Sequence, residues 1–212
     1  QYDVKHILTG GNLSTECVRN PVDWMYYQTD SRQLRDIHDR FGQRPLRTFP
    51  ITNIVRHKLV LPYFKRIKVL RPLDFVDYVK KEAMQTLIAR FGWAPYPQKH
   101  FESRFTKFYE GFWLPKRFGY DTRKVQFSSL ILTGQMSRNE ALELLQSNPF
   151  SDEEAERELN YVAMKLGLSR ESLLSYFELP KKTYRDYKSQ HLLYSLGSRV
   201  LKALNLEIGG KR

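Results

Sequence analysis

Positively charged and aromatic side chains are interleaved through residues 98–138, and such residue types bind anionic ligands. The stretch contains eight Lys or Arg residues, three acidic residues and nine aromatic residues. Lysine and arginine hold phosphate or carboxylate oxygens through charge-assisted hydrogen bonds, and aromatic faces stack on bases or on the apolar faces of sugars. The composition therefore favours a ligand that joins an anionic group to a ring, such as a nucleotide sugar or a nucleic acid.

A glycine-containing loop follows the first apolar segment of the chain. Residues 8–16 read LTGGNLSTE, with Gly10 and Gly11 directly before a helical pattern. Two glycines let the backbone approach a ligand closely, and the N–H groups at the start of a helix attract phosphate. Tight strand-to-helix turns also need glycine, so a structural and a phosphate-binding interpretation of this loop both stay open.

Length and charge set wide limits on the partners of the protein. A chain of 212 residues can bury a substantial core and favours one domain, or one and a half. Lys and Arg outnumber Asp and Glu by 35 to 23, and the resulting net charge of +12 attracts polyanions without specifying which.

The sequence begins with Gln and runs almost at once into a strand pattern, so we expect a further N-terminal part to precede it.

The cysteine and histidine content points to no disulfide and no metal site. Cys17 is the only cysteine and lacks the flanking glycines of a nucleophile elbow, so we expect a packed side chain and a cytoplasmic location. The five histidines show neither zinc-knuckle spacing nor an HExxH pattern. No apolar run approaches the roughly 20 residues that span a bilayer, so no integral membrane contact is expected.

The first part of the chain has an α/β pattern. Residues 4–8 and 67–70 are short apolar segments typical of buried strands. After the second of them, helical spacing of apolar residues predicts a helix from Asp77 that Gly92 ends. A strand, a turn and a helix in this order form half of a βαβ unit.

Beyond Pro97 the pattern is almost wholly helical. One apolar stripe of helical spacing is expected in the core: Phe101, Phe105, Phe108 and Phe112. Capping residues predict further helix boundaries. They are Asp30 or Ser31 with Gly42, Ser137 with Glu140, Ser151 with Glu154, Gly167, Ser169 and Thr183.

Several blocks of this sequence resemble a known superfamily and one family within it. The TGGN loop with its following TE, and the RPL turn after the second strand, resemble the second half of PP-loop ATPases (ATP pyrophosphatases), in which His stands at the place of Gly11. Longer blocks are similar to the N-acetyl sugar amidotransferases of the WbpG and PseA type. They are residues 12–25, KHFESRFTKF (99–108), GYDTR (119–123), SSLILTGQMSR (128–138) and LPKKTY (179–184).

The resemblance extends over about residues 5–190 and implies an α/β fold. It implies the C-terminal part of an adenine-nucleotide alpha-hydrolase-like domain, with a PP-loop, Rossmann-like parallel sheet, followed by a mainly helical extension. We place the α/β part at residues 1–95 and the helical substrate-binding extension at residues 96–212. The family carries an SGGxDS pyrophosphate loop that this sequence lacks, so the chain alone is expected to have little activity.

The implied activity is the conversion of an acetamido group of a nucleotide-linked sugar to an acetamidino group, in lipopolysaccharide or O-antigen biosynthesis. In this reaction ATP adenylates the amide oxygen, pyrophosphate leaves, and ammonia expels AMP, with cations and Mg²⁺ stabilising the charge. The sequence has no glutaminase-type cysteine site. Ammonia is therefore expected from solution or from separate glutaminase and cyclase-like subunits.

The resemblance also assigns candidate site residues. The candidate catalytic residues, as proton carriers or polar sugar contacts, are His100 and Glu102. The candidate ATP-binding residues are Gly10, Gly11, Asn12 and Glu16. The candidate substrate-binding residues are Lys99, Arg104, Lys107, Asp121, Arg123, Ser128, Ser129, Gln135 and Arg138.

Two other functions fit the charge and stay open. A PP-loop enzyme that modifies transfer RNA would bind RNA with a steep salt dependence. A basic, non-enzymatic helical module would dock on a protein or a nucleic acid, with the α/β part as scaffold. The sequence favours the sugar enzyme, with no nucleic-acid partner, because the matching blocks are specific to a family and net charge is not.

Overall fold

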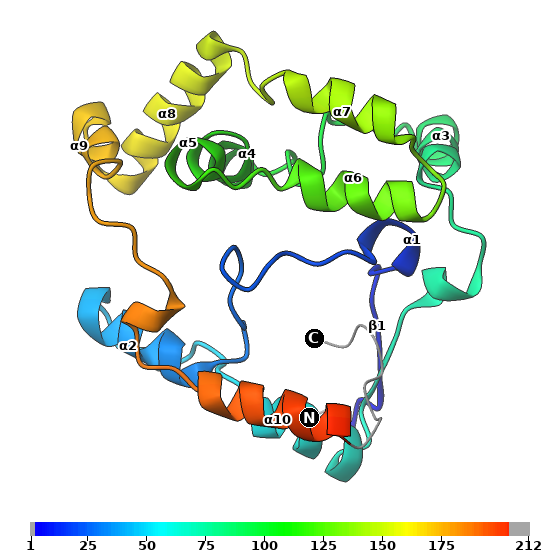
Figure 1. Ribbon diagram of the computed structural model, residues 1–212, viewed down its shortest axis with the longest axis vertical. Coiled ribbons are helices and arrows are strands. Elements are labelled where there is room, and N and C mark those ends of the chain that lie inside the picture. The colour runs from blue at the N-terminus through cyan, green and yellow to red at the C-terminus, as the bar shows by residue number, and fades with distance from the viewer. Residues whose placement is uncertain (1–2, 204–212) are drawn as a thin grey trace. The chain divides into compact units, whose positions relative to one another are not determined.

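The computed structural model describes residues 3–203, and the chain is mostly helical with a small parallel sheet (Figure 1). It divides into two compact units, each assembled from separate stretches of sequence. Unit 1 comprises Gln1–Thr9, Pro21–Arg71 and Lys182–Arg212, and unit 2 comprises Gly10–Asn20 and Pro72–Lys181. The predicted division at residue 95, between an α/β part and a helical extension, stays a prediction.

Unit 1 contains the sheet. Strands β1 (His6–Leu8) and β2 (Lys68–Leu70) pair in parallel, with Ile7 opposite Val69. Both predicted strands are thus confirmed over three residues each, and the fold is mixed α/β. The side chains of both strands are exposed, whereas parallel sheets are usually covered on both faces. Two strands do not establish a Rossmann-like PP-loop domain, which stays a prediction.

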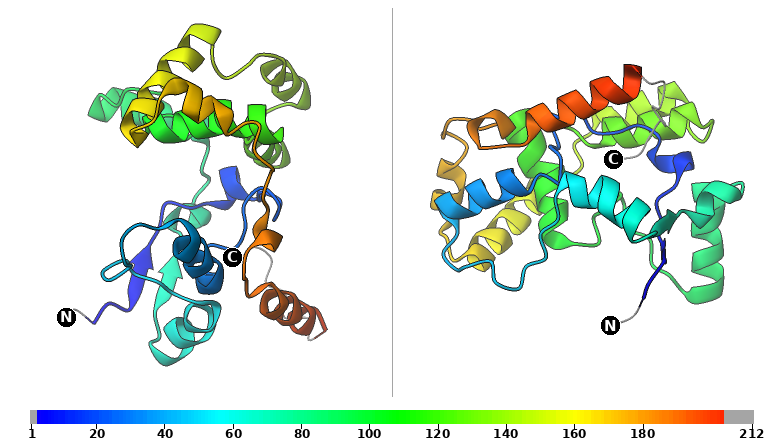
Figure 2. Two further views of the ribbon diagram at one scale, coloured as in Figure 1. Left: turned by 90° about the vertical axis from the view of Figure 1, so that its left-hand side faces the viewer. Right: turned by 90° about the horizontal axis from the view of Figure 1, so that it is seen from below.

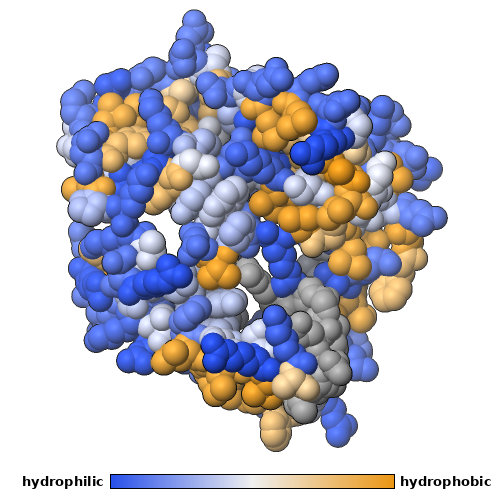
Figure 3. Space-filling view, viewed as in Figure 1, coloured by the Kyte–Doolittle hydropathy of each residue, from blue (hydrophilic) through white to orange (hydrophobic). Residues whose placement is uncertain are grey.

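The helices of unit 1 begin and end largely where local signals place them. They are α2 (Ser31–Phe41), the π-helical η1 (Arg56–Phe64), the 3-10 turn η4 (Tyr184–Asp186) and α10 (His191–Ala203). Asp30 caps α2 and Gly42 ends it, as predicted. Thr183 caps η4, and the predicted final helix starts only at His191. Apolar side chains lie on the surface of unit 1 (Figure 3). Leu192 of α10, for example, is 84% exposed.

Unit 2 is wholly helical within its described residues. Its elements are α1 (Leu13–Glu16), η2 (Pro72–Phe75), α3 (Lys80–Phe91), α4 (Arg104–Phe108), η3 (Tyr109–Trp113), α5 (Leu114–Phe118), α6 (Arg123–Leu132), α7 (Arg138–Gln146), α8 (Asp152–Leu166) and α9 (Arg170–Ser175). Over residues 3–203, no helix is long and apolar enough to cross a membrane.

Elements α4, η3 and α5 form one continuous helix with a π-helical centre. Pro115 lacks an N–H, so the carbonyl of Gly111 has no donor at the usual α-helical spacing, and a local π-helical stretch accommodates this. Helix α8 packs along α4 (Figure 2). Together with α9 they form the core of unit 2, made of Phe108, Leu159, Val162, Ala163 and Leu173.

The predicted phenylalanine stripe is confirmed in part. Phe101 and Phe108 are buried, and Phe112 packs against the core. Phe105 is 54% exposed instead. Helix α4 begins only after Ser103, so Phe101 lies in the preceding turn and does not share a helical face with Phe105.

The predicted caps of unit 2 are confirmed. Ser137 with Glu140 and Ser151 with Glu154 each form a complete capping box at the start of α7 and α8. Ser169 caps α9, and Gly167 ends α8 in the left-handed conformation. Gly92 ends α3 in the same way (φ 62°), although α3 begins at Lys80 and not at Asp77.

Candidate functional site

The TGGN loop of unit 2 is held by the side chain of Asn12. Asn12 is buried, and its Oδ1 atom accepts hydrogen bonds from the Thr15 N–H (2.8 Å) and the Thr15 hydroxyl (3.1 Å). Its Nδ2 atom donates to the Gly10 carbonyl at 3.4 Å. The predicted nucleotide-binding residue Asn12 therefore shapes the loop and caps α1.

The first N–H groups of α1 are already engaged. The Leu13 N–H donates to Asp74 Oδ1 at 2.7 Å, and the Thr15 N–H is bonded to Asn12. The groups that we expected to be free for phosphate are thus occupied at these two positions. By contrast, Gly10 faces open space, because a Cβ added there would meet no atom within 4 Å. Gly11 is partly buried.

Gln135 joins this loop to the start of α3. Its Nε2 atom donates to the Ser14 carbonyl (3.2 Å) and to the Tyr78 carbonyl (3.4 Å). Its Oε1 atom accepts from the Lys80 N–H at 2.9 Å. A residue predicted to contact the sugar thus links three segments of unit 2, and it fixes how α3 begins relative to α1.

Helix α6 holds α1 through two hydroxyl groups. Ser129 is buried, and its Oγ atom accepts from the Val18 N–H (3.0 Å) and donates to the Val125 carbonyl (3.3 Å). The Thr133 hydroxyl donates to the Ser14 carbonyl at 2.7 Å. The predicted nucleotide side and part of the predicted substrate side therefore meet within one unit.

Two lysines lie beside this junction. Burial lowers the pKa of Lys80, and the nearby positive charge of Lys99 lowers it further. Lys99 forms an ion pair with Glu16, which brings two predicted site residues together. The Lys80 ammonium has no carboxylate partner among residues 3–203. We call Lys80 and Lys99 the lysine pair.

Sequence reasoning missed Lys80. Its only local signal is its place at the first turn of a helix, where an acidic residue is usually favoured. Nothing in the spacing indicates that a loop 19 residues further along returns to place Lys99 near it. Tertiary structure brings the two side chains together, so the pair was found only in the folded chain.

The candidate catalytic histidine is bonded to a carboxylate. His100 Nδ1 lies 3.0 Å and 3.2 Å from the two Glu110 oxygens, and this hydrogen bond raises the pKa of His100. The Thr122 hydroxyl donates to the same carboxylate at 3.4 Å. His100 also adopts a left-handed backbone (φ 71°), which costs energy in a residue other than glycine. Glu102 is exposed beside it.

The pH dependence of folding stability is expected to reveal the His100–Glu110 pair. Because the folded pKa of His100 is raised, protonation stabilises the fold below the unfolded pKa, and this stability is lost as pH rises through the folded pKa. The unfolding free energy should therefore fall between about pH 6 and pH 8. The ring is 45% exposed, which limits the effect to less than about 1 kcal/mol.

Urea unfolding of the wild-type chain and of Glu110→Gln at both pH values measures this effect. Glu110→Gln should flatten the dependence, because the amide carries no charge to stabilise imidazolium. A variant with the same pH dependence as the wild type would contradict the role of the pair.

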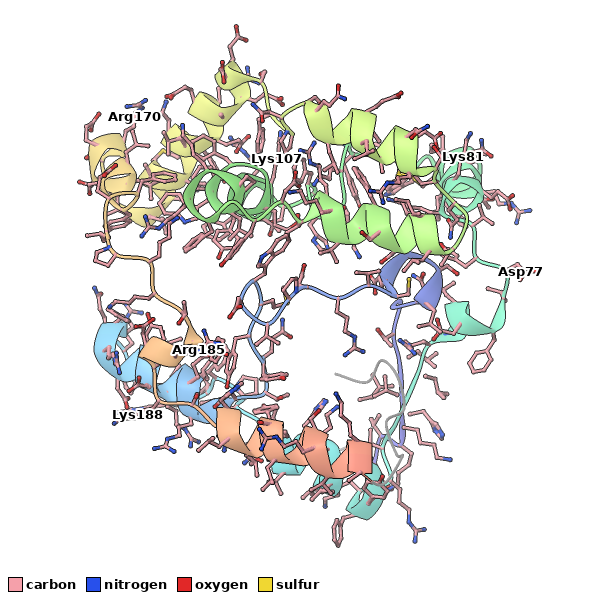
Figure 4. The ribbon with its side chains drawn as sticks, in the orientation of Figure 1. Asp77, Lys81, Lys107, Arg170, Arg185 and Lys188 are labelled. Atoms are coloured by element: carbon pink, nitrogen blue, oxygen red, sulfur yellow. The ribbon has the colours of Figure 1, made fainter. Side chains whose placement is uncertain are left out.

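Two predicted ligand cations hold α4 on α8 instead of lying free. Arg104 Nε donates to Glu158 Oε2 at 3.0 Å, and the guanidinium lies over the Tyr161 ring, 3.5 Å from its centre. Lys107 Nζ lies 3.3 Å from Glu154 Oε1 (Figure 4). Both cations contribute to the helix interface, and a ligand would have to compete with these carboxylates.

Arg123 is engaged more completely. It is 7% exposed, and its Nε and Nη2 atoms donate to the Asp121 carboxylate, with Nη2 at 2.7 Å from Oδ2. Its Nη1 atom donates to the carbonyls of Leu144 (3.0 Å) and Ser147 (2.8 Å) at the end of α7. Asp121 and Arg123 therefore fasten α6 to α7.

Two further residues were predicted to bind substrate, and a surface hollow lies beside Gln135. The Ser128 hydroxyl donates to the Lys124 carbonyl within α6 (2.6 Å), and Arg138 is exposed at the start of α7. A hollow of about 430 Å³ is lined by Gln135, Met136, Leu144 and two glutamates of α7. Its acidic lining suits hydroxyl groups better than phosphate. Among the described residues, no group of three or more His, Cys, Asp or Glu side chains could hold a metal ion.

Comparison with known proteins found a match for the helical part of the chain. Residues 102–201 match the family model described as LPS biosynthesis protein WbpG-like, C-terminal domain. The match supports the WbpG-type family. No curated protein and no solved structure matches the chain.

The WbpG-like region contains most of the predicted substrate residues and extends over both units, because residues 102–181 lie in unit 2 and residues 182–201 in unit 1. It excludes the TGGN loop, Lys99 and His100. Within unit 2 it is nevertheless bonded to that loop, through Ser129, Thr133 and Gln135. The part of the WbpG-like region that lies in unit 2 is thus joined to the loop by hydrogen bonds.

Proposed function

We propose that this protein is an ATP-dependent amidotransferase of lipopolysaccharide biosynthesis. It would convert an acetamido group of a nucleotide-linked sugar to an acetamidino group. The observation that carries the proposal is the WbpG-like match over residues 102–201, which indicates an LPS biosynthesis protein. The amidotransferase chemistry is our inference from the residues of unit 2.

The reaction requires activation of the amide oxygen as a leaving group. An amide carbonyl is a poor electrophile, and its oxygen is a poor leaving group, so ammonia does not displace it unaided. ATP, when bound, supplies the group that turns this oxygen into a leaving group. The protein's part is to position the two substrates and to stabilise the phosphate charge with fixed cations.

The lysine pair is the best-placed source of this charge. The pKa of Lys80 is lowered by burial and by the charge of Lys99, and an anion bound beside Lys80 would stabilise its charged form. Glu16 balances one of the two charges, so the pair keeps a net positive charge. We assign Lys80 and Lys99 to phosphate, and the open side of Gly10 to close approach of the nucleotide.

The remaining candidates take other roles in the proposal. His100, held by Glu110, is the proton carrier, and the hollow beside Gln135 takes the sugar hydroxyl groups. Arg123 is a positioning residue because its donors serve the α6–α7 contact. No side chain is assigned to Mg²⁺. Ammonia would come from a separate glutaminase with a cyclase-like subunit, and the nucleotide substrates suit a cytoplasmic enzyme.

The charge of residues 98–138 indicates a nucleic-acid partner less strongly than the composition alone suggests. Arg104, Lys107 and Arg123 each form an ion pair inside unit 2, so their charge is partly neutralised before any polyanion arrives. Nucleic-acid binding depends on cations that are free to replace counterions at phosphate. We therefore put forward no second function.

The release of AMP tests the proposal. With ATP, Mg²⁺, ammonium and a UDP-linked N-acetyl sugar, the full-length protein should release AMP only when both ammonium and the sugar are present. Lys80→Ala should weaken this activity, whereas Lys81→Ala, on the next and exposed residue of α3, should leave it unchanged. AMP release that depends on RNA and not on sugar would overturn the proposal.

A further inference from the structure

Unit 1 has a polar hollow that no part of the proposed reaction uses. It has a volume of about 340 Å³ and lies between α2 and residues 188–190. Its lining includes Arg32, Arg35, Asp36 and Asp39 of α2, together with Lys188 and Gln190. Figure 4 marks Lys188 beside α2.

The wall opposite α2 is fixed by hydrogen bonds at alternate residues. Asp30 Oδ2 accepts from the Gln190 N–H (2.6 Å), and Asp36 Oδ2 accepts from the Lys188 N–H (2.9 Å). Arg40 Nη1 donates to the Asp186 carbonyl at 3.0 Å. The segment is therefore tied along the length of α2, and the hollow belongs to the fold of unit 1.

The charge in this hollow is positive. Asp36 is already balanced by Arg40, whose Nη2 atom lies 2.7 Å away, and by the Lys188 N–H. Arg32, Arg35 and Lys188 have no carboxylate partner within residues 3–203. These three cations outnumber the one remaining carboxylate, that of Asp39, so the hollow favours binding of an anion. Arginine binds phosphate oxygens especially well.

Asp39 indicates that the ligand also carries hydroxyl groups. Its carboxylate is exposed in the lining of the hollow and is not part of an ion pair with the described residues. A carboxylate accepts hydrogen bonds from hydroxyl groups and repels phosphate. A ligand hydroxyl would therefore donate to Asp39, while the phosphate binds the cations.

We propose that the hollow of unit 1 binds a phosphate ester that also bears hydroxyl groups. Arg32, Arg35 and Lys188 hold the phosphate, and Asp39 accepts hydrogen bonds from the polyol part. The volume lies at the small end of the range for ligand pockets, roughly 300–1,000 Å³. The proposal concerns other residues than the amidotransferase proposal and stands without it.

Titration calorimetry with glycerol 3-phosphate, inorganic phosphate and glycerol tests this site in the full chain. Glycerol 3-phosphate should bind, phosphate should compete more weakly, and glycerol should not bind. The double variant Arg32→Ala/Arg35→Ala should bind glycerol 3-phosphate at least about tenfold more weakly, as expected for lost charge-assisted hydrogen bonds. Arg44→Ala/Arg47→Ala removes the same charge from exposed residues outside the hollow and should bind normally.

A single variant tests the phosphate contact without disturbing the fold. Lys188→Ala keeps the backbone N–H that bonds Asp36, so it removes a phosphate contact and leaves the wall intact. It should also weaken binding, with an unchanged circular dichroism spectrum. The proposal is overturned if wild-type protein does not bind glycerol 3-phosphate, if phosphate binds equally tightly, or if the Arg44/Arg47 variant is weakened as much as the Arg32/Arg35 variant.

Discussion

Arg123→Ala is expected to reduce the unfolding free energy by about 3–5 kcal/mol, because it breaks a buried ion pair and leaves its partner behind. Asp121 would keep a carboxylate that is only 17% exposed, with its bidentate partner gone. The carbonyls of Leu144 and Ser147 would lose their donor as well. Urea or thermal unfolding followed by circular dichroism measures the loss.

Two further variants separate this effect from a general effect of charge. Lys124→Ala removes the neighbouring exposed cation and should change stability by no more than about 0.5 kcal/mol. Arg123→Lys keeps the charge but cannot form the planar, bidentate contact, so it should recover only a part of the stability. An Arg123→Ala protein as stable as the wild type would show that this network does not hold α6 to α7.

Local signals predicted the boundaries of elements well. The capping boxes at Ser137 and Ser151 and the end of α3 at Gly92 depend on a few neighbouring residues, and the sequence states those residues directly. The start of α3 was placed too early. Asp77 is a good cap by type, but the Gln135 side chain receives the Lys80 N–H, and helix α3 starts there instead.

The burial of aromatic and charged side chains was harder to predict. The spacing of Phe105 matches the core stripe, yet its exposure is decided by where α4 begins and which face meets α8. Arg123 has the residue type of a ligand contact, and only the folded chain shows that α7 ends against its guanidinium. The spacing of apolar residues predicts that a segment is helical. It does not predict which other helix packs against it.

The candidate site was predicted as a set of residues, and the structure arranges them differently. Glu16 with Lys99, and Gln135 with the residues around Ser14, do lie together in unit 2. Asn12 is used for capping instead of facing outward. Lys80 was missed because the effect of Lys99 on it depends on the tertiary structure, which no motif records.

Gly10→Ala is expected to lower amidotransferase activity by about 100-fold, since a displacement of a bound group by about 1 Å has an effect of this size. The proposal places the nucleotide against the open side of Gly10, and an added methyl group would occupy that space. The protein itself should tolerate the change, because the new Cβ meets no atom within 4 Å and the backbone is not in the left-handed region. AMP release and thermal unfolding of the same sample of full-length protein separate the two effects.

Gly197→Ala in α10 is the matched control for this variant. A Cβ at Gly197 also meets no atom within 4 Å, and alanine raises helix propensity there by roughly 1 kcal/mol. It should therefore keep full activity and unfold at the same or a slightly higher temperature. If Gly10→Ala releases AMP as fast as Gly197→Ala, no ligand approaches the TGGN loop on that side, and the nucleotide must be placed elsewhere in unit 2. If Gly10→Ala loses activity and folds normally, the open face of the loop is where substrate binds.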